Sequence, residues 1–520
     1  MNRFLHTIAL LLLNFHWIQA QNYYTTMDVN NAEYRVSNSG VFFNDPMFAR
    51  GVYYVPKLLN TSLIYATAFW FGAVDENGQI KLAGMRYGES GSDFKPGPYS
   101  TSDYGNAYGN AIWQVTSAEI ETHMQSWNTP GYVIPSGILN WPGNGDTDFG
   151  VAEKLAPFRD LNQNDIYEPQ LGEYPLIKGC EAIYMILNDY TLHTETQGEP
   201  IHIEVHYMFY QYLSDNALNN TTFMDVTVYN RTNTMWQDFK ISLFADNDIG
   251  NSTDDYVGCD TTKNVFYAYN ADNIDEPNSG IPGFGTNPPA AGFLSLNQKA
   301  SSFIAYKDIS SSSYPHILPS FTSGMWMNMN GYWSDGSNIL DNNGNPTRFM
   351  YHESPLVSNS YSETGIGNPP RDVRTLTTFD AILLPGGKKE LSFAILYNRS
   401  GNSLQNAADL LLVADSIQQW YDAGIEGCTI QPLGVEELQS LSTFTAFPNP
   451  AADNVTIRFE QPVTGNLTIS SVNGNVVSKF PVNAQEITIP TNKLSEGVYF
   501  IGLESARSSY NKTKLVIVHK

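Results

Sequence analysis

Residues 220–232 read NTTFMDVTVYNRT, and the alternation of their side chains decides the fold class of most of the chain. Two sets of side chains alternate along this stretch: Met224, Val226 and Val228 in one set, and Phe223, Asp225, Thr227 and Tyr229 in the other. A period of two residues is typical of a strand with one buried face. The segments on either side, IHIEVHYMFYQYL at 201–213 and DFKISLFAD at 238–246, repeat the pattern. These three neighbouring segments predict an antiparallel sheet.

Two hairpins and two helices surround this sheet in the sequence. Residues 62–88 and 375–399 each contain two apolar runs around a turn, which is Asp-Glu-Asn-Gly in the first and Pro-Gly-Gly in the second. One short helix is predicted at 117–124. A longer helix is predicted at 403–424, with Ser403 as its N-cap and one apolar stripe. That stripe consists of Leu410, Val413, Ala414, Ile417, Trp420 and Tyr421.

The composition favours many short strands joined by turns. The chain has 520 residues, among them 40 Gly and 28 Pro, and only 15% of its residues are charged. This length predicts two or three domains. The formal net charge of −24 repels nucleic acid and anionic lipid, so neither is expected as a main partner. The same charge suits a cationic partner, including a hard metal ion.

The first twenty residues predict a secretory signal peptide. They combine Arg3 with an apolar run at 8–13 and the small residue Ala20, after which we expect cleavage. The run is too short to span a membrane as a helix.

The whole pattern predicts a mainly β protein. Its parts are a large antiparallel β-sandwich-type body with long loops and one late helix, and a small C-terminal Ig-like β-sandwich of six or seven strands. The expected order is a signal peptide at 1–20, a β-rich body at 21–430 with room for two subdomains, a linker at 431–443 and the C-terminal domain at 444–520.

The C-terminal domain carries several motifs of a known family. FPNPAADNVTI begins at Phe447, and LTISSVNGNVV, LSEGVYFIGLES and KLVIVHK follow in order. This series resembles the type A C-terminal sorting domain of the type IX secretion system of Bacteroidetes. Pro448 and Pro450 block strand pairing at the entrance of the domain. The motif residues that we assign to sorting are Phe447, Pro448, Asn449, Pro450, Gly497, Tyr499 and Lys514.

The resemblance implies a route and partners. The protein would cross the inner membrane with its signal peptide, reach the type IX machinery of the outer membrane through the periplasm, and finish secreted or on the cell surface, with surface lipopolysaccharide or glycans as further partners. The alternative is a C-terminal carbohydrate-binding or adhesion sandwich that stays on the protein. The body more loosely resembles an uncharacterised group of secreted proteins of the same bacteria, and this adds no chemistry.

One acidic loop, DLNQNDIYEPQLGEYP at 160–175, predicts a structural calcium site. Side-chain oxygens at alternate positions of such a loop converge on one hard cation. The predicted ligands are Asp160, Asn162, Asn164, the carbonyl of Ile166, Glu168 and Glu173. Asp165 stands where such loops place glycine, so a polar turn without an ion is the alternative.

A second acidic group follows the segment at 238–246. It consists of Asp246, Asp248, Asp254, Asp255 and Asp260. Three readings stay open for it: a second calcium site, a general acid–base pair, or a solvated loop at the end of a strand.

The remaining signals leave the activity of the body open. His202, Glu204 and His206 share one strand face, which suits a transition metal or an exposed polar surface. The three cysteines, Cys180, Cys259 and Cys428, allow one disulfide and a free thiol, or three buried thiols. The sequence contains no nucleophile or phosphate-binding motif. It favours a non-enzymatic structural or adhesive protein, with a polysaccharide hydrolase or a glycan-binding protein as alternatives. The aromatic residues at 326–333 are the candidate sugar platform, but the favoured reading is that they are buried aromatic residues at the end of a strand.

Overall fold

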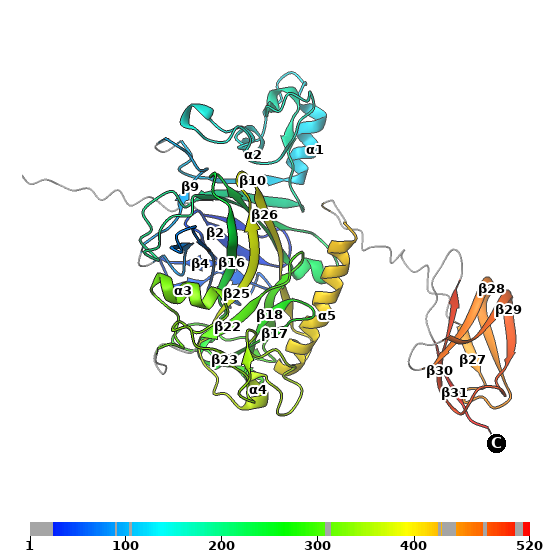
Figure 1. Ribbon diagram of the computed structural model, residues 1–520. Helices are drawn as coiled ribbons and strands as arrows, with labels where there is room; N and C mark the ends of the chain where they lie inside the picture. The colour runs from blue at the N-terminus through cyan, green and yellow to red at the C-terminus, as the bar shows by residue number, and fades with distance from the viewer. Residues whose placement is uncertain are drawn as a thin grey trace, which may run out of the picture. The chain divides into compact units, whose positions relative to one another are not determined.

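The computed structural model describes residues 24–88, 91–102, 104, 107–306, 314–424, 428, 444–471, 476–504 and 513–519 (Figure 1). The predicted signal peptide at 1–20 and the predicted linker at 431–443 lie outside these residues. The chain divides into two compact units, Met1–Ile430 and Gln431–Lys520, which we call the body and the tail. Both units are built mainly from antiparallel strands, which confirms the predicted fold class.

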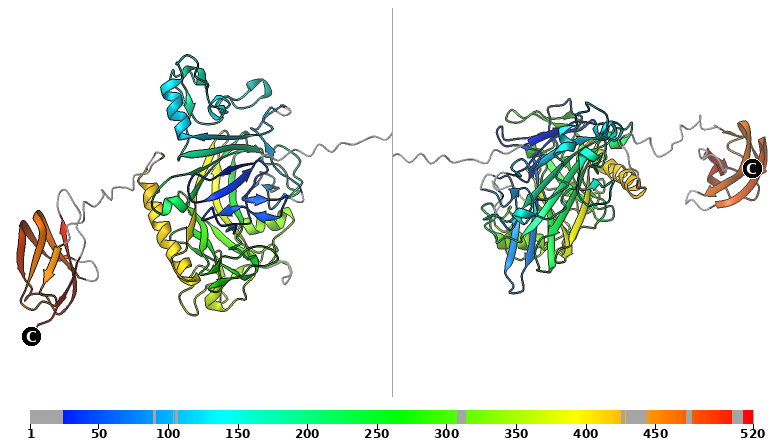
Figure 2. Two further views of the ribbon diagram at one scale, coloured as in Figure 1. Left: turned by 180° about the vertical axis from the view of Figure 1, so that it is seen from behind. Right: turned by 90° about the horizontal axis from the view of Figure 1, so that it is seen from above.

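Two antiparallel sheets, of nine strands each, form the body (Figure 2). Sheet 1 has the order β1-β2-β3-β7-β16-β25-β22, with β6 beside β2 and β8 beside β7. Its strands are β1 Tyr24–Met27, β2 Glu33–Ser37, β3 Val41–Phe42, β6 Tyr53–Tyr54, β7 Ala66–Val74, β8 Ile80–Gly84, β16 Trp236–Asp246, β22 Ser302–Tyr306 and β25 Arg374–Leu383.

Sheet 2 has the order β10-β13-β14-β15-β26-β21-β18-β17, with β9 beside β13. Its strands are β9 Lys95–Pro96, β10 Ile112–Thr116, β13 Glu181–Asn188, β14 Ile203–Gln211, β15 Thr222–Asn230, β17 Asp255–Asp260, β18 Val265–Asn270, β21 Ala290–Ser295 and β26 Lys388–Asn398. Four short pairs lie in the loops: β4 Asn44–Asp45 with β5 Arg50–Gly51, β11 Phe158–Arg159 with β12 Tyr174–Pro175, β19 Ile274–Asp275 with β20 Gly285–Thr286, and β23 Ile339–Leu340 with β24 Pro346–Thr347.

The main core lies between the two sheets. The ring of Phe69 on β7 is 5.8 Å from that of Tyr207 on β14 and 5.9 Å from that of Phe393 on β26. On β15, Met224, Val226 and Val228 are fully buried in this core, each stabilising the fold by about 1.5–3 kcal/mol. The alternation that the sequence predicts for this strand is therefore confirmed, and β15 turns its other face away from sheet 1.

The sheet assignment of one predicted strand is wrong. β14 and β15 pair as expected, but β16 lies in sheet 1 between β7 and β25. Residues 231–235 between β15 and β16 carry the chain from one sheet to the other. Since both sheets bury apolar faces against the same core, the pattern of β16 looks alike in either sheet.

The outer face of sheet 2 is covered in part by α5 Ser403–Asp422, which runs along one side of the body in Figure 1. Leu410, Ala414, Ile417 and Trp420 are buried there, as the stripe predicts. The predicted N-cap is wrong by one residue, because the Asn402 side chain accepts the N–H of Gln405. The other helices are α1 Ser117–Ser126, α2 Ser136–Leu139, α3 Thr322–Met329 and α4 Glu363–Ile366.

The aromatic residues at 326–333 belong partly to α3 and do not form an exposed sugar platform. Trp326 and Trp333 are each 7% exposed. A Cβ atom on Gly72 of β7 would lie 3.0 Å from the Trp326 ring, so glycine at this position lets α3 approach the sheet closely. Trp326 and Trp333 are part of the core.

The tail forms one five-stranded sheet with its own core. Its strands are β27 Phe444–Phe447, β28 Asn454–Ser471, β29 Val476–Pro490, β30 Gly497–Glu504 and β31 Thr513–Ile517. The sequence predicts six or seven strands, and the structure has five in the described residues. β28 spans two of the predicted strands, and the junction between them is a shift in pairing between Arg458 and Val463. Val455, Ile469 and Leu515 are fully buried in the core of the tail.

Candidate functional site

A groove of about 1190 Å³ lies on the outer face of sheet 2. The second set of side chains on β15 contributes Asp225, Thr227 and Tyr229 to its wall. The neighbouring strands and the end of α5 contribute Tyr184, His206, Met208, Tyr210, Lys388, Glu390, Trp420 and Tyr421. The remaining charged lining comes from α1 and from residues 154–178: Glu121, Lys154, Asp160, Asp165 and Lys178.

Aromatic rings pack closely beneath the groove. The ring of Tyr210 stacks 5.3 Å from that of Phe223, and Trp420 lies 5.0 Å from Phe223 and 4.8 Å from Tyr212. These rings are buried, and the half-buried Tyr229 and Tyr421 give the groove exposed aromatic surface and hydroxyl groups.

The charged side chains of the groove form ion pairs. Lys178 Nζ is 2.6 Å from Asp225 Oδ2, and Lys388 Nζ is 2.5 Å from Glu390 Oε1. Within each of these two pairs the charges balance, while the lining of the groove as a whole has five carboxylates and three lysines.

A buried acidic site lies directly behind the groove. Glu204 is fully buried on β14, accepts a hydrogen bond from His206 at 2.7 Å and one from the N–H of Tyr99 at 2.8 Å, and pairs with the Arg231 guanidinium. Burial alone would raise the pKa of Glu204, but His206 and Arg231 lower it to about 2. Burial lowers the pKa of His206 more than Glu204 raises it, so the imidazole is neutral near pH 7 and contacts the Tyr184 hydroxyl at 2.5 Å.

The arrangement at His202, Glu204 and His206 differs from both readings of the sequence. Glu204 and His206 are buried, so they do not form an exposed polar face. His202 precedes β14, and its φ of 65° breaks the alternation that would place it beside them. An ion pair with Arg231 holds the glutamate where the sequence suggests a metal.

The loop at 160–173 uses many of its side-chain oxygens to hold its own backbone. Asp160 accepts the N–H groups of Gln163 at 2.6 Å and Asp165 at 2.8 Å, and both of these residues adopt positive φ, 62° and 65°. Desolvation raises the pKa of Asp160, but these N–H groups lower it below its usual value. Asp165 thus takes the left-handed conformation for which such loops use glycine.

The other predicted ligands of this loop also have partners. Glu168 accepts hydrogen bonds from the side-chain amides of Asn162 and Asn164, at 3.0 and 2.7 Å. Glu173 is fully buried and accepts the backbone N–H groups of Leu161 and Glu168. Ile166 follows in the same turn, where its N–H donates to Asn164. The binding of calcium by this loop stays a prediction.

The structure divides the second acidic group into three places. Asp246 and Asp248 lie at the end of β16, Asp254 and Asp255 lie at the start of β17, and Asp260 accepts hydrogen bonds from the turn that follows β17. These five residues therefore do not form one acidic cluster.

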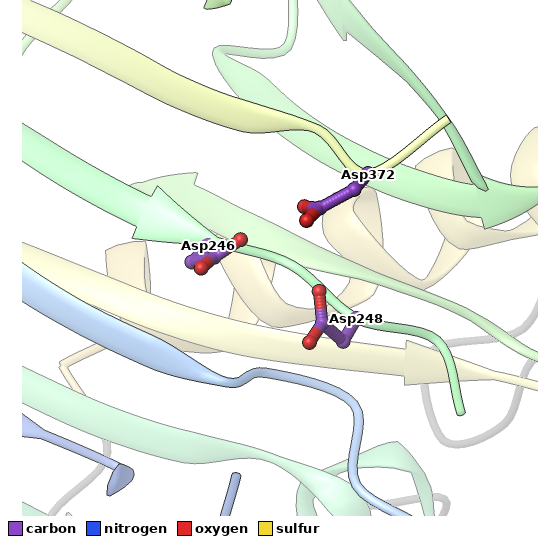
Figure 3. Close-up of side chains that lie close together, drawn as sticks. All are labelled: Asp246, Asp248 and Asp372. Atoms are coloured by element: carbon purple, nitrogen blue, oxygen red, sulfur yellow. The ribbon is translucent and has the colours of Figure 1, made fainter. Parts of the chain in front are cut away.

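One further residue, Asp372, joins Asp246 and Asp248 (Figure 3). One carboxylate oxygen of each of the three lies within 4.8 Å of those of the other two. Sequence reasoning misses Asp372 because it follows Asp248 by more than a hundred positions. Only the pairing of β16 with β25 brings them together, and no local pattern reveals that pairing.

Two of the three cysteines are linked. Cys180, immediately before β13, forms a disulfide with Cys428, and Cys259 is a buried free thiol on β17. Of the two readings of the sequence, the structure therefore has the one disulfide and the spare thiol.

The motif residues of the tail organise its first turn and its last two strands. The Asn449 side chain donates to the carbonyl of Lys514 at 2.7 Å and accepts the N–H of Val516 at 2.8 Å, which ties the FPNP segment to β31. Gly497 begins β30 with a φ of 154°, and the Tyr499 hydroxyl donates to a backbone carbonyl near the start of the same strand. Phe447 is 41% exposed.

Comparisons with known proteins find one family and several distant structures. Residues 445–518 match the secretion system C-terminal sorting domain, and no curated protein matches the chain. A polysaccharide lyase is similar at 8% identity over 61% of this chain and 34% of that chain, with a TM-score of 0.17. Dimeric latent PorU from Porphyromonas gingivalis is similar at 10% identity over 66% and 32%, with a TM-score of 0.13. The BSP domain of a biofilm-associated protein is similar at 11% over 65% and 60%, with a TM-score of 0.14.

The chain spans about a third of the length of the first two of these structures. TM-scores this low carry no argument about the fold or the activity of the body. In the described part of the chain, every helix is too short or too polar to cross a membrane. Residues 445–518 belong to the family of C-terminal sorting domains and mark the chain as a secreted or cell-surface protein of the type IX secretion system.

Proposed function

We propose that the body is a non-enzymatic adhesive module that binds an uncharged glycan in the groove of sheet 2. The observation that carries the proposal is the groove itself. Its volume of about 1190 Å³ exceeds the range of about 300–1,000 Å³ usual for small-molecule sites, so it suits several sugar units. Two half-buried tyrosines of its wall, Tyr229 and Tyr421, offer apolar surface for the faces of sugar rings and hydroxyl groups for their edges.

The charges of the groove favour a neutral ligand. Lys178 and Lys388 are each paired with a carboxylate, so neither ammonium group is free to attract an anion. A ligand rich in hydroxyl groups can hydrogen-bond to these pairs without removing either partner.

A polysaccharide hydrolase is the less supported alternative. Such an enzyme requires two carboxyl groups on opposite sides of the substrate, one of them protonated. Asp225 and Glu390 in the groove are each held in an ion pair with a lysine. Asp246 and Asp248 do not line the groove and point toward one centre with Asp372.

A glycan array probed with the purified protein tests the ligand. We expect binding to at least one neutral oligosaccharide, and loss of that binding in Tyr229→Ala and Tyr421→Ala. Tyr190→Ala is the matched control, because Tyr190 is 49% exposed and lies outside the groove. No binding to any glycan would contradict the adhesive function, and release of reducing sugar from a bound polysaccharide would favour the hydrolase.

The tail and the surface anchor are tested in cells. Deleting residues 444–520 should leave the body folded in the periplasm, because the tail is a separate unit with its own core. We further propose lipopolysaccharide as the surface anchor of the exported body. Cell fractionation measures the first expectation, and recovery of the body free in the medium from cells with intact lipopolysaccharide would contradict the second.

A further inference from the structure

Asp246, Asp248 and Asp372 form an acidic triad, in which Asp246 and Asp248 each have one carboxylate oxygen without a hydrogen-bond donor. Asp246 is only 2% exposed, and its Oδ1 is buried without a hydrogen-bond partner. The Oδ1 atom of Asp248 is likewise buried and accepts no hydrogen bond. A buried carboxylate oxygen without a donor is costly, so two of them in one place point to a missing partner.

The surrounding residues hold Asp246 in place through its other oxygen, Oδ2. The Tyr87 hydroxyl donates to Asp246 Oδ2 at 2.7 Å and in turn accepts a hydrogen bond from Arg374 Nε at 2.9 Å. Arg374 also contacts Asp372 through Nη1 at 2.8 Å. Figure 3 shows the three carboxylates directed toward one another from the end of β16 and from the segment that leads into β25.

The charge of the site calls for a divalent cation. Three carboxylates and the single Arg374 guanidinium leave a net charge of −2, and Asp255 adds further negative potential near Asp248.

The spacing of the oxygens allows one shared cation. The three ligand atoms of the triad lie within 4.8 Å of one another, and calcium binds oxygens at about 2.4 Å. All three are carboxylate oxygens, the ligand type that hard cations prefer. A zinc or copper site would be expected to include histidine or cysteine.

We infer that Asp246, Asp248 and Asp372 bind one calcium ion that joins the end of β16 to the start of β25. The unused oxygens of Asp246 and Asp248 would coordinate the ion. The ion would add the positive charge that Arg374 alone does not supply. Because β16 and β25 are adjacent in the middle of sheet 1, the ion would stabilise the body rather than act in catalysis. The inference does not depend on a glycan in the groove.

Calcium titration by calorimetry, on the purified full protein freed of metal by a chelator, tests this site. We expect wild-type protein to bind calcium, and Asp248→Asn and Asp372→Asn to weaken the affinity about 10-fold or more. Asp380→Asn is the matched control, since Asp380 is an exposed carboxylate on the same strand as Arg374. Asp160→Asn, in the loop at 160–173, should leave binding at the triad intact.

Thermal melting of the same proteins shows whether Asp248 binds the ion or only supports the fold. In chelator, Asp248→Asn should melt at the same temperature as wild type or higher, because it removes repulsion. In calcium it should melt lower than wild type. The inference is overturned if wild type binds no calcium, if the triad variants bind it as well as wild type, if only Asp160→Asn abolishes binding, or if Asp248→Asn melts lower in both conditions.

Discussion

Glu204 in sheet 2 and Asp246 in sheet 1 are both buried carboxylates, yet their pKa values move in opposite directions. Glu204 has His206 and Arg231 as partners, and its pKa is lowered to about 2. Asp246 lies beside two more carboxylates and one arginine, and its pKa is raised to about 6. Burial is common to both residues, so the balance of neighbouring charges decides the outcome. Where the fold does not supply enough positive charge, we infer that a cation from solution does.

The largest expected effect on stability comes from removing the buried ion pair between Glu204 and Arg231. Glu204→Gln should lower the free energy of unfolding at pH 7 by about 3–5 kcal/mol, because it leaves Arg231 without its buried partner. Urea denaturation measures the change. Glu390→Gln is the control, since its ion pair with Lys388 is exposed and should contribute about 0–1 kcal/mol. Equal effects of the two substitutions would break the contrast between the buried and the exposed site.

The next largest effect concerns the triad. Removing calcium should lower the free energy of unfolding of wild-type protein by about 2.7 kcal/mol when the reference calcium concentration is a hundred times the Kd. Thermal melting with and without chelator measures the loss, and the Asp372→Asn protein should lose less. A wild-type melting curve that is the same in both conditions would mean that the triad needs no cation.

Acid should weaken the Glu204 site in a defined range. Because the folded pKa is depressed to about 2, the site contributes its full stability above the unfolded value of about 4.5 and loses it as the pH falls toward 2. Between pH 7 and pH 3 we expect the stability difference between wild type and Glu204→Gln to shrink by about 2 kcal/mol. Urea denaturation at several pH values measures it, and a constant difference would contradict the assigned pKa.

The smallest expected effect lies in the loop at 160–173. Glu173→Gln should lower the free energy of unfolding by about 1 kcal/mol. Two backbone N–H groups donate to the two carboxylate oxygens of Glu173, and glutamine would keep an acceptor for only one of them. The comparison is sharpened by repeating the urea measurement in calcium and in chelator. An effect of the same size in both would mean that hydrogen bonds alone fix the loop, and a larger effect in calcium would favour the calcium ligands that the sequence predicts.

Features that depend on neighbouring residues could be predicted from the sequence. The alternation of Met224, Val226 and Val228 follows from the period of a strand, and the FPNP segment marks the start of the tail. The pairing of β16 with β25 and the place of Asp372 could not be predicted, because both depend on contacts between distant segments. The groove escaped prediction for the same reason, since its wall joins side chains from four strands and a helix.

The disulfide between Cys180 and Cys428 has a consequence for transport. It joins two residues 248 positions apart, and such bonds form in oxidising compartments, of which the periplasm is the one on this route. Once this bond has formed, the chain cannot be drawn through a pore as a single extended thread. A channel that passes the oxidised body must therefore be wide enough for at least two segments of chain at once.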